Sequence, residues 1–303
     1  MRRRARLKRL SAGGRPFPVR AVVFAGLLFV LFPLIVALRT RLWDGRLPVS
    51  VAVPDGEAVK IVVFDPEGGA LTTIVIPGNT LLETTRRQGA WEIGKVWDVG
   101  EDEGLGGRLL AESMTKSFRL PVAAWANREF LAISGEEGSI LLAIFSTETN
   151  LAVGDRVRMA VFAQGVNATA KSTLEASTIG LVKPALLPSG EQGFKPADNV
   201  GTNVTNLFSV SAVSEEGARV QIINRTGGRE AVSKVSRILD VYGARVGLVT
   251  DQEVSDEDCT VLVQEESAVS KVLQQVLGCE VGSMDEGVFD VVILLGERFS
   301  GRF

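Results

Sequence analysis

The chain has 303 residues, of which 46% are hydrophobic, which is enough for about two domains with packed cores. Its net charge of −3 is unevenly spread: residues 1–20 hold eight basic side chains and no acidic one, so the remainder is more acidic than the average. An acidic body argues against a nucleic-acid partner, whose phosphates need a basic surface. The absence of histidine excludes histidine-based catalysis and His-ligated zinc.

An uncharged apolar stretch follows the basic segment and covers residues 21–38. As a helix rising about 1.5 Å per residue, it nearly spans a hydrocarbon core of about 30 Å, and Trp43 suits the far interface. A cleaved signal peptide is the alternative, but the stretch is longer than such peptides carry, and arginines stand where cleavage would fall. We therefore expect a single-pass signal anchor, with a cytoplasmic basic tail at 1–20 and the C-terminal domains extracytoplasmic.

Residues 45–200 contain the patterns of a first α/β domain. Short β-branched runs separated by Pro, Gly and Asp predict strands that form an antiparallel hairpin. Apolar residues at helical spacing predict helices further on, and the run at 139–145 fits either another strand or a buried helix. The strands are expected at 49–53, 58–64 and 70–76, and the helices at 106–118 and 128–133.

Residues 165–206 are rich in Gly, Ser, Asn, Thr and Pro, which predicts an irregular surface segment, and we place a linker at 201–216. Beyond it, residues 217–303 alternate strands and helices. Continuous apolar strands predict cover by helices, and hence a small C-terminal α/β sandwich domain. The strands are expected at 219–223, 245–249, 259–263, 279–282 and 289–295, and the helices at 229–242 and 267–277.

Three polar groups are candidates for a binding site. Arg86, Arg87 and Lys95 form a modest basic cluster that could meet a phosphate, although exposed loops carry such charges routinely. Residues 224–228 (NRTGG) lie at a strand-to-helix junction that can receive an anion, but they match no phosphate-binding motif, which favours a plain turn. The acidic loop at 251–258 lacks the ligand spacing of an EF-hand, which favours a solvated loop over a cation site.

The two cysteines of the chain, Cys259 and Cys279, both lie in the last segment. Two buried thiols are the plainer interpretation. The alternative is a disulfide that closes a loop of about 20 residues in an extracytoplasmic domain. Metal binding by two thiols without histidine is not expected.

Two parts of the chain resemble the LytR-CpsA-Psr family. The stretches RVQIINRTGGREAVSKVSRILDVYGARVGLV and DVVILLGERF are similar to the LytR-type C-terminal domain of many members, with Arg225 in place of the usual Gly of its turn. The stretches FDPEGGALTTIVIPGNT, GAWEIGKVWDVGE and LPVAAW resemble a reduced form of the family's catalytic domain. The resemblance implies a membrane-anchored envelope protein built from a degenerate family domain and this C-terminal domain.

The resemblance also implies what the chain lacks. In active members Ile-Pro is followed by Arg-Asp; arginines bind the pyrophosphate of a polyprenyl-linked glycopolymer, and aspartates help to hold magnesium. Here Ile76-Pro77 is followed by Gly78-Asn79, and the Gly-x-Asp segment with its arginine is not recognisable at 49–60. Because diphosphate transfer needs its charge neutralised in place, the resemblance argues against catalysis. We expect no catalytic residue, metal or cofactor.

The sequence therefore predicts a non-catalytic, membrane-anchored protein of a bacterial cell envelope that binds glycopolymer, a polyprenyl lipid carrier or another envelope protein. One alternative is an active phosphotransferase that attaches polyprenyl-pyrophosphate-linked glycopolymers to the cell wall. It would need magnesium and surrogate cations, for which Arg86, Arg87 and Lys95 are the candidates. A second alternative is a structural anchor whose C-terminal domain recruits a protein partner.

Overall fold

A computed structural model describes residues 42–265, 267–285 and 287–303. The predicted basic tail at 1–20 and the predicted signal anchor at 21–38 lie outside the described residues. Among the residues that are described, no helix combines the length and the apolar character needed to cross a bilayer. Residues Arg41–Phe303 form one compact unit.

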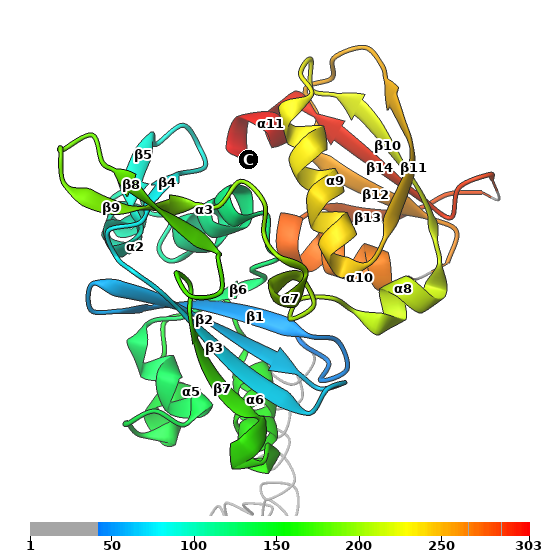
Figure 1. The fold of residues 1–303 in the computed structure, drawn as a ribbon. Helices are drawn as coiled ribbons and strands as arrows, with labels where there is room; N and C mark the ends of the chain where they lie inside the picture. The colour runs from blue at the N-terminus through cyan, green and yellow to red at the C-terminus, as the bar shows by residue number, and fades with distance from the viewer. Residues whose placement is uncertain (1–41, 266, 286) are drawn as a thin grey trace, which may run out of the picture. The chain divides into compact units, whose positions relative to one another are not determined.

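The first half of this unit is built on a five-stranded mixed sheet with the order β6-β1-β2-β3-β7 (Figure 1). The central strands β1, β2 and β3 run antiparallel in sequence order, as predicted, whereas β6 and β7 pair in parallel at the two edges. The strands are β1 (Val49–Asp55), β2 (Ala58–Asp65), β3 (Ala70–Ile76), β6 (Ala124–Trp125) and β7 (Lys171–Glu175).

Helices cover both faces of this sheet, because its strands alternate apolar side chains between two cores. Val62 and Phe64 of β2 face a core shared with α4, α5 and α6, whereas Ile61 and Val63 face a core shared with α2 and α3. Figure 1 shows the two helical layers on opposite sides of the sheet. Their bounds are α2 (Ile93–Asp102), α3 (Arg108–Phe118), η1 (Arg128–Phe130), α4 (Leu131–Ser134), α5 (Ile140–Phe145) and α6 (Val153–Gly165).

The segment predicted to be irregular, 165–206, is more ordered than expected. It supplies edge strand β7, whose pattern was missed because Lys171–Glu175 is largely exposed and carries polar residues. It also forms the hairpin of β8 and β9, while a second small hairpin, β4 with β5, follows β3. The remaining elements of this half are β4 (Leu81–Glu83), β5 (Ala90–Glu92), η2 (Ala168–Ala170), β8 (Val182–Leu186), β9 (Gln192–Pro196), α7 (Thr202–Thr205) and α8 (Ser211–Glu216).

The C-terminal half contains a second five-stranded sheet with the order β11-β10-β14-β12-β13, in which only β12 and β14 run antiparallel. The inward side chains of β10, Val220 and Ile222, are fully buried in a core that includes Val235 of α9 and Leu273 of α10. The five strands and helices α9 and α10 agree with the predicted elements, but helix α11 was not predicted, and edge strand β11 is largely exposed instead of covered by helices. The elements of this half are β10 (Arg219–Arg225), α9 (Glu230–Tyr242), β11 (Arg245–Asp251), β12 (Cys259–Val263), α10 (Ala268–Leu277), β13 (Glu280–Ser283), β14 (Val291–Gly296) and α11 (Glu297–Arg302).

A disulfide joins Cys259 at the start of β12 to Cys279, which precedes β13. The two Cα atoms are 4.6 Å apart, and both side chains are buried. The pairing follows from the topology, since β12 and β13 are parallel neighbours joined through α10.

The predicted domain limits, 45–200 and 217–303 with a linker at 201–216, stay a prediction. The two sheets lie on either side of 201–216, which contains α7 and α8. However, one continuous set of buried apolar residues includes strands of both sheets, for example Val51 and Val220.

Candidate functional site

The segment that follows β3 is where the family resemblance expects an arginine and an aspartate. It forms a turn that is closed by Thr80, whose N–H and hydroxyl both donate to the Pro77 carbonyl, at 3.0 and 2.6 Å. The chain then meets the start of α2, where the N–H of Ile93 donates to the Thr80 carbonyl at 2.8 Å. Gly78 and Asn79 therefore lie inside a tight junction between backbone segments.

No side chain fits at Gly78. An added Cβ would stand 1.5 Å from the carbonyl oxygen of Glu57, in the two-residue turn Gly56-Glu57 between β1 and β2. Gly94 of α2 faces the same oxygen, which its added Cβ would meet at 2.5 Å. The short turn packs directly against these glycines, so an arginine at position 78 would have no room.

Asn79 is engaged by the β8–β9 hairpin. Its carbonyl accepts the N–H of Phe194 at 3.1 Å, and its side-chain Nδ2 donates to the carbonyl of Gln192 at 3.3 Å. The amide thus ties two backbone segments together. No group of three or more Asp, Glu, Cys or His side chains in the described part of the chain is arranged to hold a metal ion.

The predicted cation Arg86 belongs to a cluster with α3. Arg86 and Arg87 stand in the β4–β5 turn, both with left-handed backbone at φ 57° and 60°, which is rare for non-glycine residues. Arg86 pairs bidentately with Glu112, at 2.9 and 3.0 Å, and Arg108 donates its Nε to the same carboxylate at 2.8 Å. One carboxylate therefore serves two guanidinium groups, so the cluster keeps one positive charge in excess.

The other two predicted cations do not share these contacts. Lys95 is exposed on α2 and pairs with Glu92 at 3.0 Å. Arg87 makes no ion pair with a described residue, and its guanidinium lies beside Gly301 of α11. The pairing of Arg86 with Glu112 was not predicted. The i, i+4 spacing of Arg108 and Glu112 on a predicted helix did indicate that these two residues form an ion pair.

A groove of about 470 Å³ opens beside Arg108 and Glu112. Its walls come from α3, from the segment around β6 and from the end of α10, and they carry polar and apolar surface in similar measure; Asn150 and Gln275 add to the polar part. The apolar lining includes Leu105, Ala111, Val122, Trp125, Val276 and Leu277. Ligand pockets commonly combine such walls with a few polar groups. An amphiphilic anion therefore fits this place, with its charge on the arginines and its apolar part in the groove.

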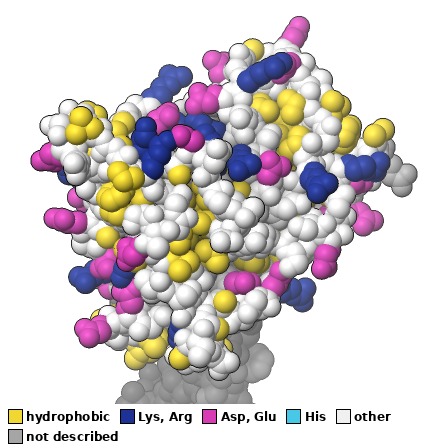
Figure 2. All heavy atoms as spheres, viewed as in Figure 1, with side chains coloured by type: hydrophobic (Ala, Val, Ile, Leu, Met, Phe, Trp, Pro, Cys, Tyr) yellow, Lys and Arg dark blue, Asp and Glu magenta, His cyan; other side chains and the backbone are white. Residues whose placement is uncertain are grey.

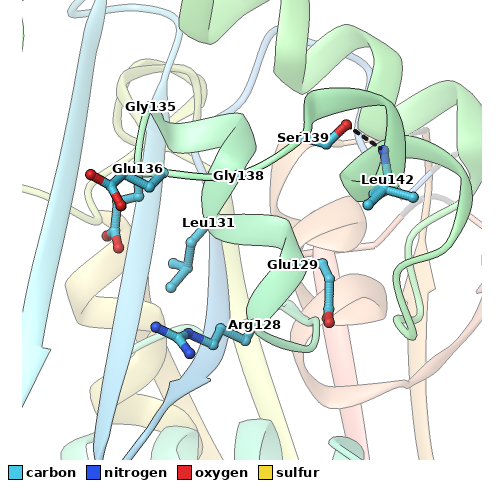
Figure 3. A pocket seen from close by; sticks show the side chains of 9 residues that line it. Arg128, Glu129, Leu131, Gly135, Glu136, Gly138, Ser139 and Leu142 are labelled. Atoms are coloured by element: carbon cyan, nitrogen blue, oxygen red, sulfur yellow. Dashed lines mark hydrogen bonds between the residues drawn. The ribbon is translucent and has the colours of Figure 1, made fainter.

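A larger hollow, of about 660 Å³, lies on the other side of the sheet (Figure 3). Its lining holds three carboxylates, Glu129, Glu136 and Glu137, against one cation, Arg128. That cation is already bound to Asp55 at 2.9 Å. The lining is therefore acidic and disfavours a phosphate ligand.

A chain of opposite charges lies at the edge of this hollow. Lys60 bridges Asp55 and Glu136, with Nζ–O distances of 2.7 and 2.6 Å. The hydrogen bond from Lys60 is the main cause that lowers the pKa of Asp55, and the charge of Arg128 adds to it. In this network of Arg128, Asp55, Lys60 and Glu136, each charge is neutralised by a neighbouring one. The network therefore ties η1 and the 135–139 loop to the β1–β2 hairpin, and none of its four charges is left to bind a ligand.

The C-terminal candidates are likewise occupied by their own contacts. Asn224 accepts from the N–H and hydroxyl of Thr226, at 3.1 and 2.8 Å, and donates to the Gly228 carbonyl at 3.0 Å. This is a closed turn, as the motif comparison favoured. In the acidic loop, arginines pair with four of the carboxylates. The pairs are Arg229–Asp251, Arg298–Asp256, Arg225–Glu257 and Arg302–Asp258.

Comparisons with known proteins find partial likenesses. No protein-family model matches the chain, and no curated protein matches it. TagV of Bacillus subtilis is 11% identical over 51% of this chain and 92% of its own, with a TM-score of 0.37. The LytR-CPS2A-psr family protein YwtF (TagT), solved with bound octaprenyl pyrophosphate lipid, is 12% identical over 52% and 88%, with a TM-score of 0.36.

A further structure, TagT bound to LIIa-WTA, is 12% identical over 52% of this chain and 89% of its own, with a TM-score of 0.36. One of these neighbours, YwtF (TagT), carries the name of the family that the sequence resembles. At TM-scores this low the neighbours carry no argument of their own, so the functional proposal rests on the residues of this chain.

Proposed function

We propose that this chain is a membrane-anchored, extracytoplasmic envelope protein that binds a polyprenyl-linked or glycopolymer ligand without transferring it. Its family resemblance supports the envelope setting, and residues 21–38 would supply the anchor. The disulfide between Cys259 and Cys279 is consistent with an oxidising compartment, where such bonds persist.

The close contact at Gly78 carries the non-catalytic part of the proposal. Transfer of a diphosphate needs cations held against its developing charge. The backbone of Glu57 fills the space that a side chain at Gly78 would take, at 1.5 Å from the added Cβ. Two of the three surrogate cations, Arg86 and Lys95, already neutralise carboxylates.

The groove beside Arg108 supports binding. A phosphate group would meet the excess charge of the Arg86–Glu112–Arg108 cluster, and a prenyl chain would lie along Trp125 and Val276. A volume of about 470 Å³ holds a few isoprene units of such a chain. The ligand class is therefore an amphiphilic anion, held by charge at one end and by apolar contact along the rest.

The test uses the full chain in lipid nanodiscs with magnesium and a fluorescent short-chain polyprenyl pyrophosphate. We expect saturable binding without release of phosphate. The variant Arg108→Gln should weaken binding, whereas Arg245→Gln should not, because it removes an equal charge from the exposed edge strand β11. Release of phosphate above a protein-free blank would replace the proposal with the transferase. Equal binding by both variants would remove the ligand from the groove.

The structural-anchor alternative is favoured by a separate observation. Edge strand β11 leaves Leu248 and Val249 partly exposed on the C-terminal sheet. An open edge strand with apolar side chains is suited to pairing with another chain. Crosslinking in intact membranes would support this alternative if protein adducts form at β11 and no lipid or glycan is captured.

A further inference from the structure

Helix α5 has an apolar face that nothing in the described structure covers. The helix (ILLAIF) carries no charge, and only Ala143 and Ile144 of it are buried. Leu141, Leu142 and Phe145 are 69%, 55% and 67% exposed. The sequence predicted a strand or a buried helix here; the helix is confirmed, but its burial is wrong, because half of its apolar residues point outward.

The neighbouring helix α6 also carries exposed apolar side chains. Val157 and Val161 stand one turn apart on its exposed side, and Val161 is 67% exposed. We call Leu141, Leu142, Phe145, Val157 and Val161 the α5–α6 apolar face. Soluble proteins scatter exposed apolar residues singly, whereas adjoining ones usually mark a contact surface. Figure 2 shows hydrophobic side chains at the lower edge of the molecule, where Figure 1 places α5.

The first residues that the structure describes, 42–44, contact helix α6. The buried carboxylate of Asp155 accepts the N–H groups of Leu42 and Trp43, at 3.0 and 3.3 Å. Arg158 donates to the carbonyl of Asp44 at 3.2 Å, and the ring of Trp43 packs edge-on against Phe162. Residues 42–44 are thus fastened to the same helix that carries Val157 and Val161.

The length of chain before Leu42 limits how far a bilayer can be. The apolar stretch at 21–38 ends four residues earlier, and an extended chain covers at most about 3.6 Å per residue, or about 14 Å in all. If that stretch spans the membrane, the lipid surface lies within this reach of α6.

We propose that the α5–α6 apolar face lies on the outer surface of the bilayer, with its five side chains in the interfacial region. The inference rests on the proposed membrane anchoring and adds a second, non-covalent contact to it. The face has no charged member, so the contact itself is apolar. Leu142 also borders the acidic hollow that holds Glu129, Glu136 and Glu137, so anionic lipid would not strengthen the contact. It would fix the orientation of the ectodomain relative to the membrane, which a single point of anchoring does not define.

The test labels single introduced cysteines with an environment-sensitive fluorophore. The two native cysteines form a disulfide, so only the introduced thiol reacts. The variants are Leu141→Cys and Phe145→Cys. Leu186→Cys is the matched control: this leucine is 74% exposed and lies on the β8–β9 hairpin, across the sheet from α5 (Figure 1). Each full chain is placed in nanodiscs that contain lipids with a spin-label quencher near the headgroup.

We expect the labels at 141 and 145 to shift to shorter wavelength and to lose fluorescence to the lipid quencher, and the label at 186 to do neither. Equal quenching at all three positions in a chain retained by the nanodiscs would overturn the inference and leave the anchoring intact. A wavelength shift without lipid quenching would also overturn it, because a second copy or another protein would then cover the face. A chain that elutes free of the nanodiscs would overturn the anchoring itself.

Discussion

Replacing Gly78 with alanine tests the close packing on which the non-catalytic assignment depends. The new Cβ would stand 1.5 Å from the carbonyl oxygen of Glu57 and 2.5 Å from its carbonyl carbon. Ordinary contact begins above about 3 Å, so the β1–β2 turn must move by about 1.5 Å or more. That turn joins two buried central strands, which limits how far it can give way.

The expected cost follows from this geometry. Overpacking of a well-filled site costs about 1–3 kcal/mol, and the obstacle at Gly78 is backbone that no rotamer change can move. We therefore expect a loss of about 3 kcal/mol in the free energy of unfolding. For a unit of this size that loss lowers Tm by roughly 6–12 °C. Gly165→Ala is the matched control, because its added Cβ meets nothing within 4 Å at the end of α6.

The assay is urea unfolding followed by tryptophan fluorescence, with the midpoint and slope fitted for each variant. Gly165→Ala should be neutral or stabilising by up to about 1 kcal/mol, since alanine favours a helix over glycine. If Gly78→Ala unfolds at the same urea concentration as the control, the turn yields freely. In that case an arginine could be accommodated after Pro77, and the steric argument against catalysis would fail.

Three further outcomes are expected. Glu112→Gln should raise the affinity for inorganic pyrophosphate about two- to fivefold, the equivalent of ~0.5–1 kcal/mol for a partly exposed charge pair, in a low-salt titration; unchanged affinity would show that the cluster does not bind the probe. Joint replacement of Cys259 and Cys279 by alanine should cost about 3 kcal/mol in urea unfolding, because the bond closes a loop with a separation of 20 residues; equal midpoints with and without the bond would contradict this. The hydrogen bond from Arg219 lowers the pKa of Asp290 to about 2, so the pair stabilises fully above the ordinary pKa of about 3.9. That contribution is lost as the pH falls towards 2, so the Tm difference between the native chain and Asp290→Asn should shrink over this range. A constant difference would refute the shift.

Much of the fold could be predicted from local pattern. The β-branched runs that form β1, β2 and β3 are buried on both faces, and the turns between them contain glycine and aspartate. The strand pattern and the turn residues therefore predict the same strand boundaries. In the C-terminal half, helices α9 and α10 were predicted for the same reason, since each buries one apolar stripe against a sheet. The short helix α11 was not predicted.

Elements whose burial contradicts their polarity were missed. Helix α6 buries Asp155 and Arg156 and exposes Val157 and Val161, so its pattern does not read as an amphipathic helix. The buried carboxylate is stable there because it accepts backbone N–H groups from residues more than 100 positions away. No local pattern contains such a partner.

For the candidate site, too, some features were determined by the sequence and others only by the tertiary structure. The sequence alone determined that glycine stands where the family has arginine, that histidine is absent, and that an apolar stretch precedes the folded part. Only the tertiary structure decided that Gly78 is held against Glu57, and that Arg86 is neutralised by Glu112 from another element. Composition and spacing show which charged and polar side chains are present in a sequence. Whether a charge is free to bind a ligand depends on its neighbours in space, which only folding brings together.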